Sequence, residues 1–214
     1  MNVQDVRWQD DRWVVRYLDA VAEVGLALKS QESEIKNCVF LLFSLWKQDR
    51  WLFVAGNGGS ASTATHLAAD LVKTVVGAPG QRGLKAVALV DNIPLASAAA
   101  NDWGWSELFR PMLETYWQPG SVVMAISVHG GAGQDQAGAW SQNLLRAIQF
   151  VKDHGGKTIA LTGFDGGAMK ELCDVCIVVP ADSTPLVESF HVVLHHMIAF
   201  RLKAMIADHI SRGG

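Results

Sequence analysis

The hydrophobic residues beyond position 50 fall into short, continuous runs. Each run ends in or near Gly, Asn, Asp or Pro, and segments with apolar residues at three- and four-residue spacing lie between them. Continuous apolar strands that alternate with helices are typical of a parallel sheet covered by helices on both faces. The pattern therefore predicts a doubly wound, five-stranded parallel sheet of the α/β class. The predicted strands occupy residues 51–56, 84–91, 121–128, 157–163 and 174–180.

Helical periodicity marks both ends of the chain. Residues 10–49 have apolar positions three and four apart, which predicts two helices that form an N-terminal extension. In the last helix Thr184 suits the N-cap and Pro185 the first helical position, and the pattern runs to about Asp208. We expect N-terminal helices over 1–50, packed on the domain and on a subunit interface, and one domain over 51–214.

Composition narrows the classes of protein. Half of the 214 residues are hydrophobic, 18% are charged, and the net charge is −3 without a cluster of Lys and Arg, so nucleic acid is not an expected partner. The opening MNVQDVRWQDDRW lacks the apolar core of a secretory signal, and Asp, Asn, Pro or Gly interrupts the longest apolar runs well short of a membrane span. Three cysteines make no disulfide framework. We expect a soluble cytoplasmic protein without a membrane partner.

The first predicted strand leads into the turn Gly56-Asn57-Gly58-Gly59-Ser60, and a helix follows. Glycines in such a turn allow positive φ angles, and the free N–H groups of the helix attract anions. A simpler explanation is a tight strand-to-helix turn with no ligand. Three glycines exceed what a turn needs, so we favour an anion or sugar-phosphate site. Gly56-x-Gly58-x-x-Ala61 also fits a dinucleotide fingerprint, but Asp91 lies well past the usual offset of about 20 residues.

Histidines and carboxylates recur at helical spacing in two segments. His66 and Asp70 are four residues apart and share a helix face. Two His and two carboxylates make a credible zinc set, although each residue alone is more often a core or surface residue. The last helix offers four further candidates, Glu188, His191, His195 and His196. Helical geometry places the first three on one face and His196 about a quarter-turn away from Glu188.

Four segments together resemble the sugar isomerase (SIS) domain family. They are GNGGS at 56–60, His66, NDWGWSELF at 101–109 and TGFDGGAMKELCDVCIVVP at 162–180. Their order and spacing carry the resemblance, which covers residues 40–205. Within the family it is strongest to the sedoheptulose 7-phosphate isomerases, also called phosphoheptose isomerases.

The resemblance implies a homotetramer with sites shared between subunits. It also implies conversion of a ketose phosphate to an aldose phosphate through an enediol, with Zn²⁺ as cofactor. Asp70 and His196 would be the acid/base residues, and both would bind the metal with His66 and Glu188. The substrate would contact Glu188 as well. Its other contacts would be Asn57, Gly58, Gly59, Ser60, Asn101 and Asp102.

The chain departs from the family pattern at three places. Asp70 replaces a glutamate, and Glu188 replaces a glutamine. In the phosphate loop at 127–133 only Ser127 keeps its hydroxyl, so His129 could supply a charge-assisted bond unless it only packs. We expect the substrate to be anchored differently from the family pattern, and a different sugar phosphate is one explanation.

Two other functions stay open. The departures suit a non-catalytic SIS protein, either a sugar-phosphate-binding regulator or an adaptor that binds the replication initiator. A nicotinamide-dependent oxidoreductase ranks third. Cys173-x-x-Cys176 has a redox spacing but enters an apolar strand, so we interpret it as part of the core.

Overall fold

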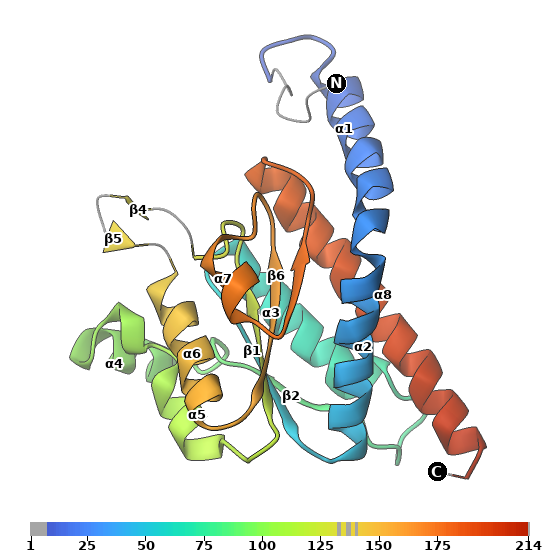
Figure 1. Ribbon diagram of the computed structural model, residues 1–214, viewed down its shortest axis with the longest axis vertical. Coiled ribbons are helices and arrows are strands. Elements are labelled where there is room, and N and C mark those ends of the chain that lie inside the picture. Colours follow the sequence, from blue (N-terminus) through green and yellow to red (C-terminus); the bar gives the residue numbers. More distant parts are fainter. Residues whose placement is uncertain (1–7, 132–133, 136–137, 140, 214) are drawn as a thin grey trace.

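A computed structural model describes residues 8–131, 134–135, 138–139 and 141–213 (Figure 1). Its main sheet is parallel and has the strand order β2-β1-β3-β6-β7. This confirms the predicted five-stranded doubly wound sheet. The strands are β1 (Trp51–Gly56), β2 (Lys85–Ala88), β3 (Val122–Ile126), β6 (Lys157–Thr162) and β7 (Val175–Val178).

The order of the strands places a switch point between β1 and β3. From β1 the chain adds β2 on one side and then returns to add β3 on the other. The connections that follow β1 and β3 leave in opposite directions, which opens a crevice beyond the carboxyl ends of these two strands. The predicted glycine turn follows β1 directly, so it lies at this crevice.

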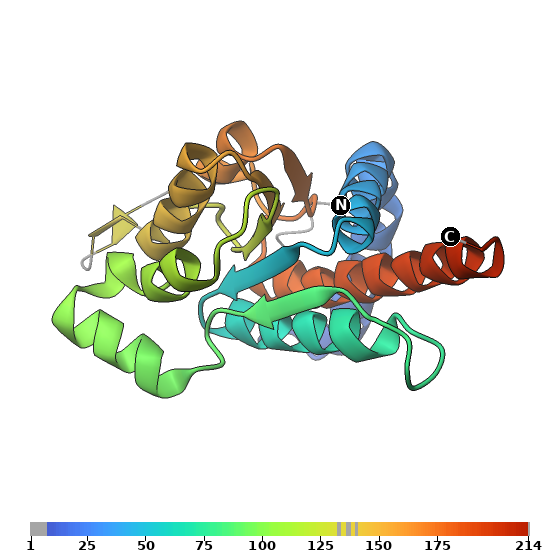
Figure 2. The same cartoon turned by 90° about the horizontal axis from the view of Figure 1, so that it is seen from below.

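Helices cover both faces of the sheet (Figures 1 and 2). Because strand side chains alternate, Leu52 and Val54 belong to one buried core, and Phe53 and Ala55 belong to the other. One face carries α1 (Trp13–Ala27), α2 (Glu32–Lys47), α3 (Gly59–Ala69) and α8 (Thr184–Ser211). The other carries α4 (Ile93–Asp102), η3 (Trp105–Glu107), α5 (Arg110–Tyr116), α6 (Gln142–Asp153) and α7 (Gly167–Leu172).

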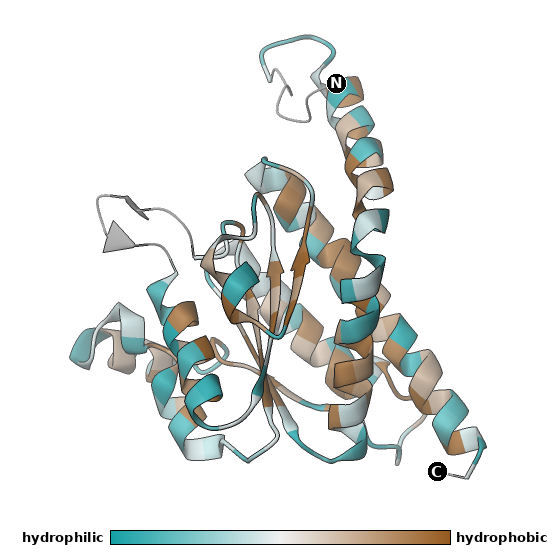
Figure 3. Ribbon diagram, in the orientation of Figure 1, coloured by the Kyte–Doolittle hydropathy of each residue, from teal (hydrophilic) through white to brown (hydrophobic). Residues whose placement is uncertain are grey.

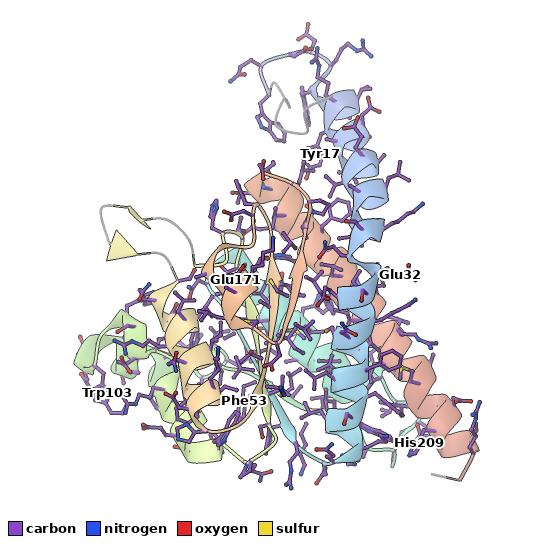
Figure 4. The ribbon with its side chains drawn as sticks, viewed as in Figure 1. Tyr17, Glu32, Phe53, Trp103, Glu171 and His209 are labelled. Carbon is purple, nitrogen blue, oxygen red and sulfur yellow. The ribbon has the colours of Figure 1, made fainter. Side chains whose placement is uncertain are left out.

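The N-terminal extension is helical, as predicted, and lies along α8. In α1 the Tyr17 hydroxyl is 3.4 Å from Ser189 Oγ, and η1 (Leu28–Gln31) leads on to α2. His209 lies near the other end of α8 (Figure 4). Its ring packs edge-on against Phe43 and Trp46. Hydrophobic residues follow the strands and much of α2 and α8 (Figure 3). By length and composition α8 would pass for a membrane-spanning helix, but core helices of soluble proteins pass the same test.

Three local features differ from the sequence-based expectations. The N-cap of α8 is Ser183 rather than Thr184, so Pro185 is the second helical residue rather than the first. A small hairpin, β4 (Gln134–Asp135) and β5 (Gly138–Ala139), separates the 127–133 loop from α6, whose N-cap is Ser141. The end of α3 widens into a π-helical turn, η2 (Asp70–Thr74), and such turns are frequent at functional sites.

Candidate active site

The glycine turn is shaped by close approaches. Gly58 has φ +54°, a conformation that favours glycine, and it caps the N-terminus of α3. A Cβ on Gly56 would lie 2.4 Å from the Ser60 carbonyl oxygen, and one on Gly59 would lie 2.6 Å from Glu188 Oε1. The turn therefore needs glycine because backbone and a carboxylate crowd it from two sides.

A pocket of about 170 Å³ opens at the switch point, beyond the ends of β1 and β3. Its wall combines the glycine turn, the loop after β3, the N-cap of α6 and the first turns of α8. Five residues that the sequence marks as substrate-binding are brought together there: Asn57, Ser60, Ser127, His129 and Glu188. Ile126, Val128, Ser141 and Leu144 complete the lining.

Two polar residues of this region were not expected from the sequence. The buried Asn143 exchanges two hydrogen bonds with Asn57, at 3.0 and 2.8 Å, and so fixes the direction of the Asn57 amide. Ser141 Oγ lies 3.2 Å from Ser127 Oγ and adds a second hydroxyl to the pocket. A serine directly before an amphipathic helix is a recognisable signal, but nothing in the sequence pairs residues 57 and 143.

His129 is a residue that the sequence suggests for phosphate binding, and that role stays a prediction. Its ring lies in the pocket wall and packs on Phe164, with 4.3 Å between the ring centroids. Packing and a contact with substrate are therefore compatible for this side chain.

A second group of polar side chains lies where α3 meets α8. Among the described residues, potential ligand atoms of four side chains lie within 4.8 Å of one another. Asp70 Oδ2 is 2.8 Å from Nε2 of His195, 3.8 Å from that of His66 and 3.9 Å from that of His196. The side chains of His66 and His196 are about half exposed, whereas that of His195 is 0% exposed. We call His66, Asp70, His195 and His196 the donor group.

Asp70 is held as a carboxylate in this group. Burial acts to raise its pKa, but hydrogen bonds from Thr74 and His195 outweigh that effect, and the pKa lies below its ordinary value. Thr74 Oγ1 donates to Oδ1 at 2.8 Å, and His195 occupies Oδ2. Burial also lowers the pKa of His195, which favours the neutral ring.

The donor group fits a zinc ion. Zinc bonds to His nitrogen and Asp oxygen of about 2.0–2.1 Å place tetrahedral ligand atoms about 3.3 Å apart. The distances from Asp70 Oδ2 to the three ring nitrogens, 2.8 to 3.9 Å, bracket that value. Imidazole and carboxylate are ordinary zinc ligands, so both the chemistry and the spacing suit the metal.

The candidate metal ligands on the last helix differ in whether they reach Asp70. His195 and His196 both reach Asp70, whereas His191 donates from Nε2 to the Thr162 carbonyl at 3.2 Å and lies outside the donor group. Glu188 lies beside Gly59 in the pocket and is not in the donor group. Its metal contact therefore stays a prediction.

The Asn101–Asp102 pair lies apart from both groups. Asn101 Nδ2 donates to Asp102 Oδ1 at 2.7 Å at the exposed end of α4, and neither residue lines the described pocket. Trp103 follows them at the outer edge of the molecule (Figure 4). This position neither establishes nor excludes the predicted contact of the pair with substrate. It stays a prediction for an assembly in which subunits share sites.

Comparison with known proteins identifies the family of this chain. The SIS domain, as a family, matches residues 16–163. The chain belongs to the SIS domain family. It is 34% identical to the phosphoheptose isomerase of Helicobacter pylori strain P12, over 80% of this chain and 84% of that protein. It is 42% identical to the lincomycin biosynthesis protein LmbN of Streptomyces lincolnensis, over 74% of this chain but only 58% of LmbN.

The SIS fold is also seen in a solved structure. Phosphoheptose isomerase GmhA from Neisseria gonorrhoeae superposes with a TM-score of 0.78, covering 89% of this chain and 97% of that one at 24% identity. This confirms the fold, and the match to the SIS domain confirms the family that the four sequence segments indicate.

Proposed function

We propose that this SIS protein is an aldose–ketose isomerase that acts on a phosphorylated sugar. The observation that carries the proposal is the pair of sites along α3 and α8, a polar pocket at the switch point and the donor group behind it. The similarity to the Helicobacter pylori phosphoheptose isomerase supports the same reaction, with sedoheptulose 7-phosphate as the first substrate to test.

The two sites are spaced for an extended substrate. Gly59 approaches Glu188, and seven residues further along each helix His66 approaches His195, so the helices run parallel. Seven residues advance a helix by about 10 Å. A sugar phosphate can therefore lie between them, with its phosphate near Ser127 and Ser141 and its reacting carbons near the donor group.

Isomerisation moves a proton between neighbouring carbons. Asp70, which is ionised, is the group that removes the proton, and His196 is the exposed group that exchanges one with the carbonyl oxygen. A zinc ion held at the donor group by His66, Asp70 and His196 would supply Lewis-acid stabilisation of the negative charge that develops. The Asn57 amide, held by Asn143, orients the sugar through its hydroxyls.

The pocket would hold the phosphate group differently from the family pattern. The 127–133 loop keeps a single hydroxyl, Ser141 adds another, and Glu188 places a carboxylate where it would repel a nearby phosphate. LmbN, by its name a protein of lincomycin biosynthesis, is another relative of this chain. Another sugar phosphate is thus the second substrate to test.

The proposed enzyme is a cytoplasmic homotetramer. An apolar groove of about 540 Å³ runs between α1, α2 and α8, and Phe40 and Met197 line it although both side chains are largely exposed. Exposed apolar surface of this kind marks interaction sites, and here a second copy would cover it. The free thiols of Cys38, Cys173 and Cys176 suit a reducing compartment.

The test is turnover of sedoheptulose 7-phosphate, followed in the anomeric region by proton NMR with and without added zinc. Zinc-dependent appearance of an aldose heptose phosphate is the expected result. Turnover only of another sugar phosphate would retain the reaction and replace the substrate. Binding of sugar phosphates without any turnover, with metal present, would favour a regulator and overturn the proposal.

A further inference from the structure

His195 differs from the other histidines of the donor group in its surroundings. Its side chain is 0% exposed, and its Nε2 lies 2.8 Å from Asp70 Oδ2, whereas those of His66 and His196 lie about 1 Å further away. We propose that His195 is a positioning residue that holds the Asp70 carboxylate toward the metal and is not itself a metal ligand. This role rests on the proposed metal-dependent reaction.

Hydrogen bonding decides between the two roles. Asp70 is a carboxylate and can only accept, so the hydrogen in this contact is on His195 Nε2. The other ring nitrogen, Nδ1, is buried and has no hydrogen-bond partner among the described residues. As a ligand through Nε2 the ring would have to carry its hydrogen on Nδ1, which would leave a buried donor unpaired. As a donor to Asp70 the neutral ring places its single hydrogen where an acceptor exists.

The same contact explains how an aspartate can serve at this position. A glutamate would reach further by one methylene group, so a shorter carboxylate must be held in a fixed direction. Thr74 takes Oδ1 and His195 takes Oδ2, one from the π-helical turn η2 and one from α8. Each carboxylate oxygen retains a second lone pair, and Oδ2 remains 3.8 and 3.9 Å from Nε2 of His66 and His196. Hydrogen bonds of this kind orient metal ligands and tune their affinity.

The test compares two variants of the full-length protein with wild type. His195→Gln keeps an N–H donor near the position of Nε2, and His195→Leu removes it at similar volume. Metal affinity is measured with Co²⁺ and Zn²⁺ against a competing chelator, and the visible absorption of Co²⁺ reports the ligand set. We expect His195→Gln to bind as wild type does. We expect His195→Leu to bind about 10–100-fold more weakly, with unchanged stoichiometry and an unchanged cobalt spectrum.

His191→Leu is the matched control. His191 is equally buried, lies one turn earlier on α8, and donates to a backbone carbonyl outside the donor group. It should lower thermal stability and leave metal affinity unchanged, which separates a loss of packing from a loss of positioning.

Three results would overturn the role. Equal loss of metal in both His195 variants, with an altered cobalt spectrum, would make the ring a ligand. Wild-type affinity in His195→Leu would remove any role in the site. Wild-type protein that binds neither metal would remove the site itself. A failure of the proposed isomerase is seen separately, as wild-type protein that binds metal but turns over no sugar phosphate.

Discussion

The buried His191 should make the protein sensitive to mild acid. Its side chain is 0% exposed, between α8 and β6, and Nε2 donates to the Thr162 carbonyl while Nδ1 has no partner among the described residues. Burial lowers its pKa from 6.5 to about 4. The folded protein therefore keeps this ring neutral at pH values at which the unfolded chain has already protonated it.

The sign and size of the effect follow from that difference. Below pH 6.5 the unfolded chain protonates this histidine, whereas the folded protein does not protonate it until the pH reaches about 4. The free energy of unfolding therefore decreases as the pH falls through this window. The loss approaches about 1.4 kcal/mol per pH unit, and between about pH 7 and pH 5 it integrates to roughly 2 kcal/mol. For a domain of this size, roughly 2 kcal/mol corresponds to a fall in Tm of about 4–8 °C.

The assay is urea denaturation of metal-free protein at about pH 7 and pH 5, for wild type and His191→Gln. Gln can retain the hydrogen bond to Thr162 but does not titrate, so the variant should lose roughly 2 kcal/mol less than wild type over this interval. His154→Gln is the control, because its exposed ring also contacts a backbone carbonyl. An equal loss in wild type and His191→Gln would refute the reasoning.

Three further changes test the pocket and the assembly. Asn143→Ala removes the partner of Asn57 and should destabilise the fold by about 1–3 kcal/mol and raise the KM for the sugar phosphate, measured by denaturation and initial rates. Gly59→Ala places a Cβ 2.6 Å from Glu188 Oε1 and should lower kcat/KM with an unchanged circular dichroism spectrum. Phe40→Glu charges the groove beside α2 and should shift the sedimentation coefficient from the tetramer to smaller species.

The sheet could be predicted from the sequence because its strands are buried on both faces. Runs such as 121–128 show no alternation, and a parallel strand between two helical layers is what such a run specifies. The β4–β5 hairpin could not be predicted in the same way, because strands of two residues carry no hydrophobic pattern. The shift of the α8 N-cap from Thr184 to Ser183 has a similar origin, since both residue types suit that position.

The site shows where helical geometry is informative and where it is not. The four-residue spacing of His66 and Asp70 predicted one face, and both residues are in the donor group. Rotation about α8 aligns Glu188 with His195 better than with His196, but rise along the axis separates Glu188 from both by about 10 Å or more. The donor group therefore includes both adjacent histidines and leaves Glu188 at the pocket. Which imidazole is buried depends on how α8 packs on α3, and that is a tertiary property.

The departures from the family pattern divide between the two ends of the proposed site. At the donor end the shorter Asp70 is accompanied by His195 and Thr74, which hold its carboxylate, so a set of zinc-compatible donors is retained. At the pocket end the changes are not compensated to the same extent. The loop has lost hydroxyls, and Glu188 adds negative charge. Metal and acid/base groups determine the reaction, whereas the pocket determines which sugar phosphate is held. This division leads us to expect the same isomerisation as in the phosphoheptose isomerases, with the phosphate of the sugar held by different groups.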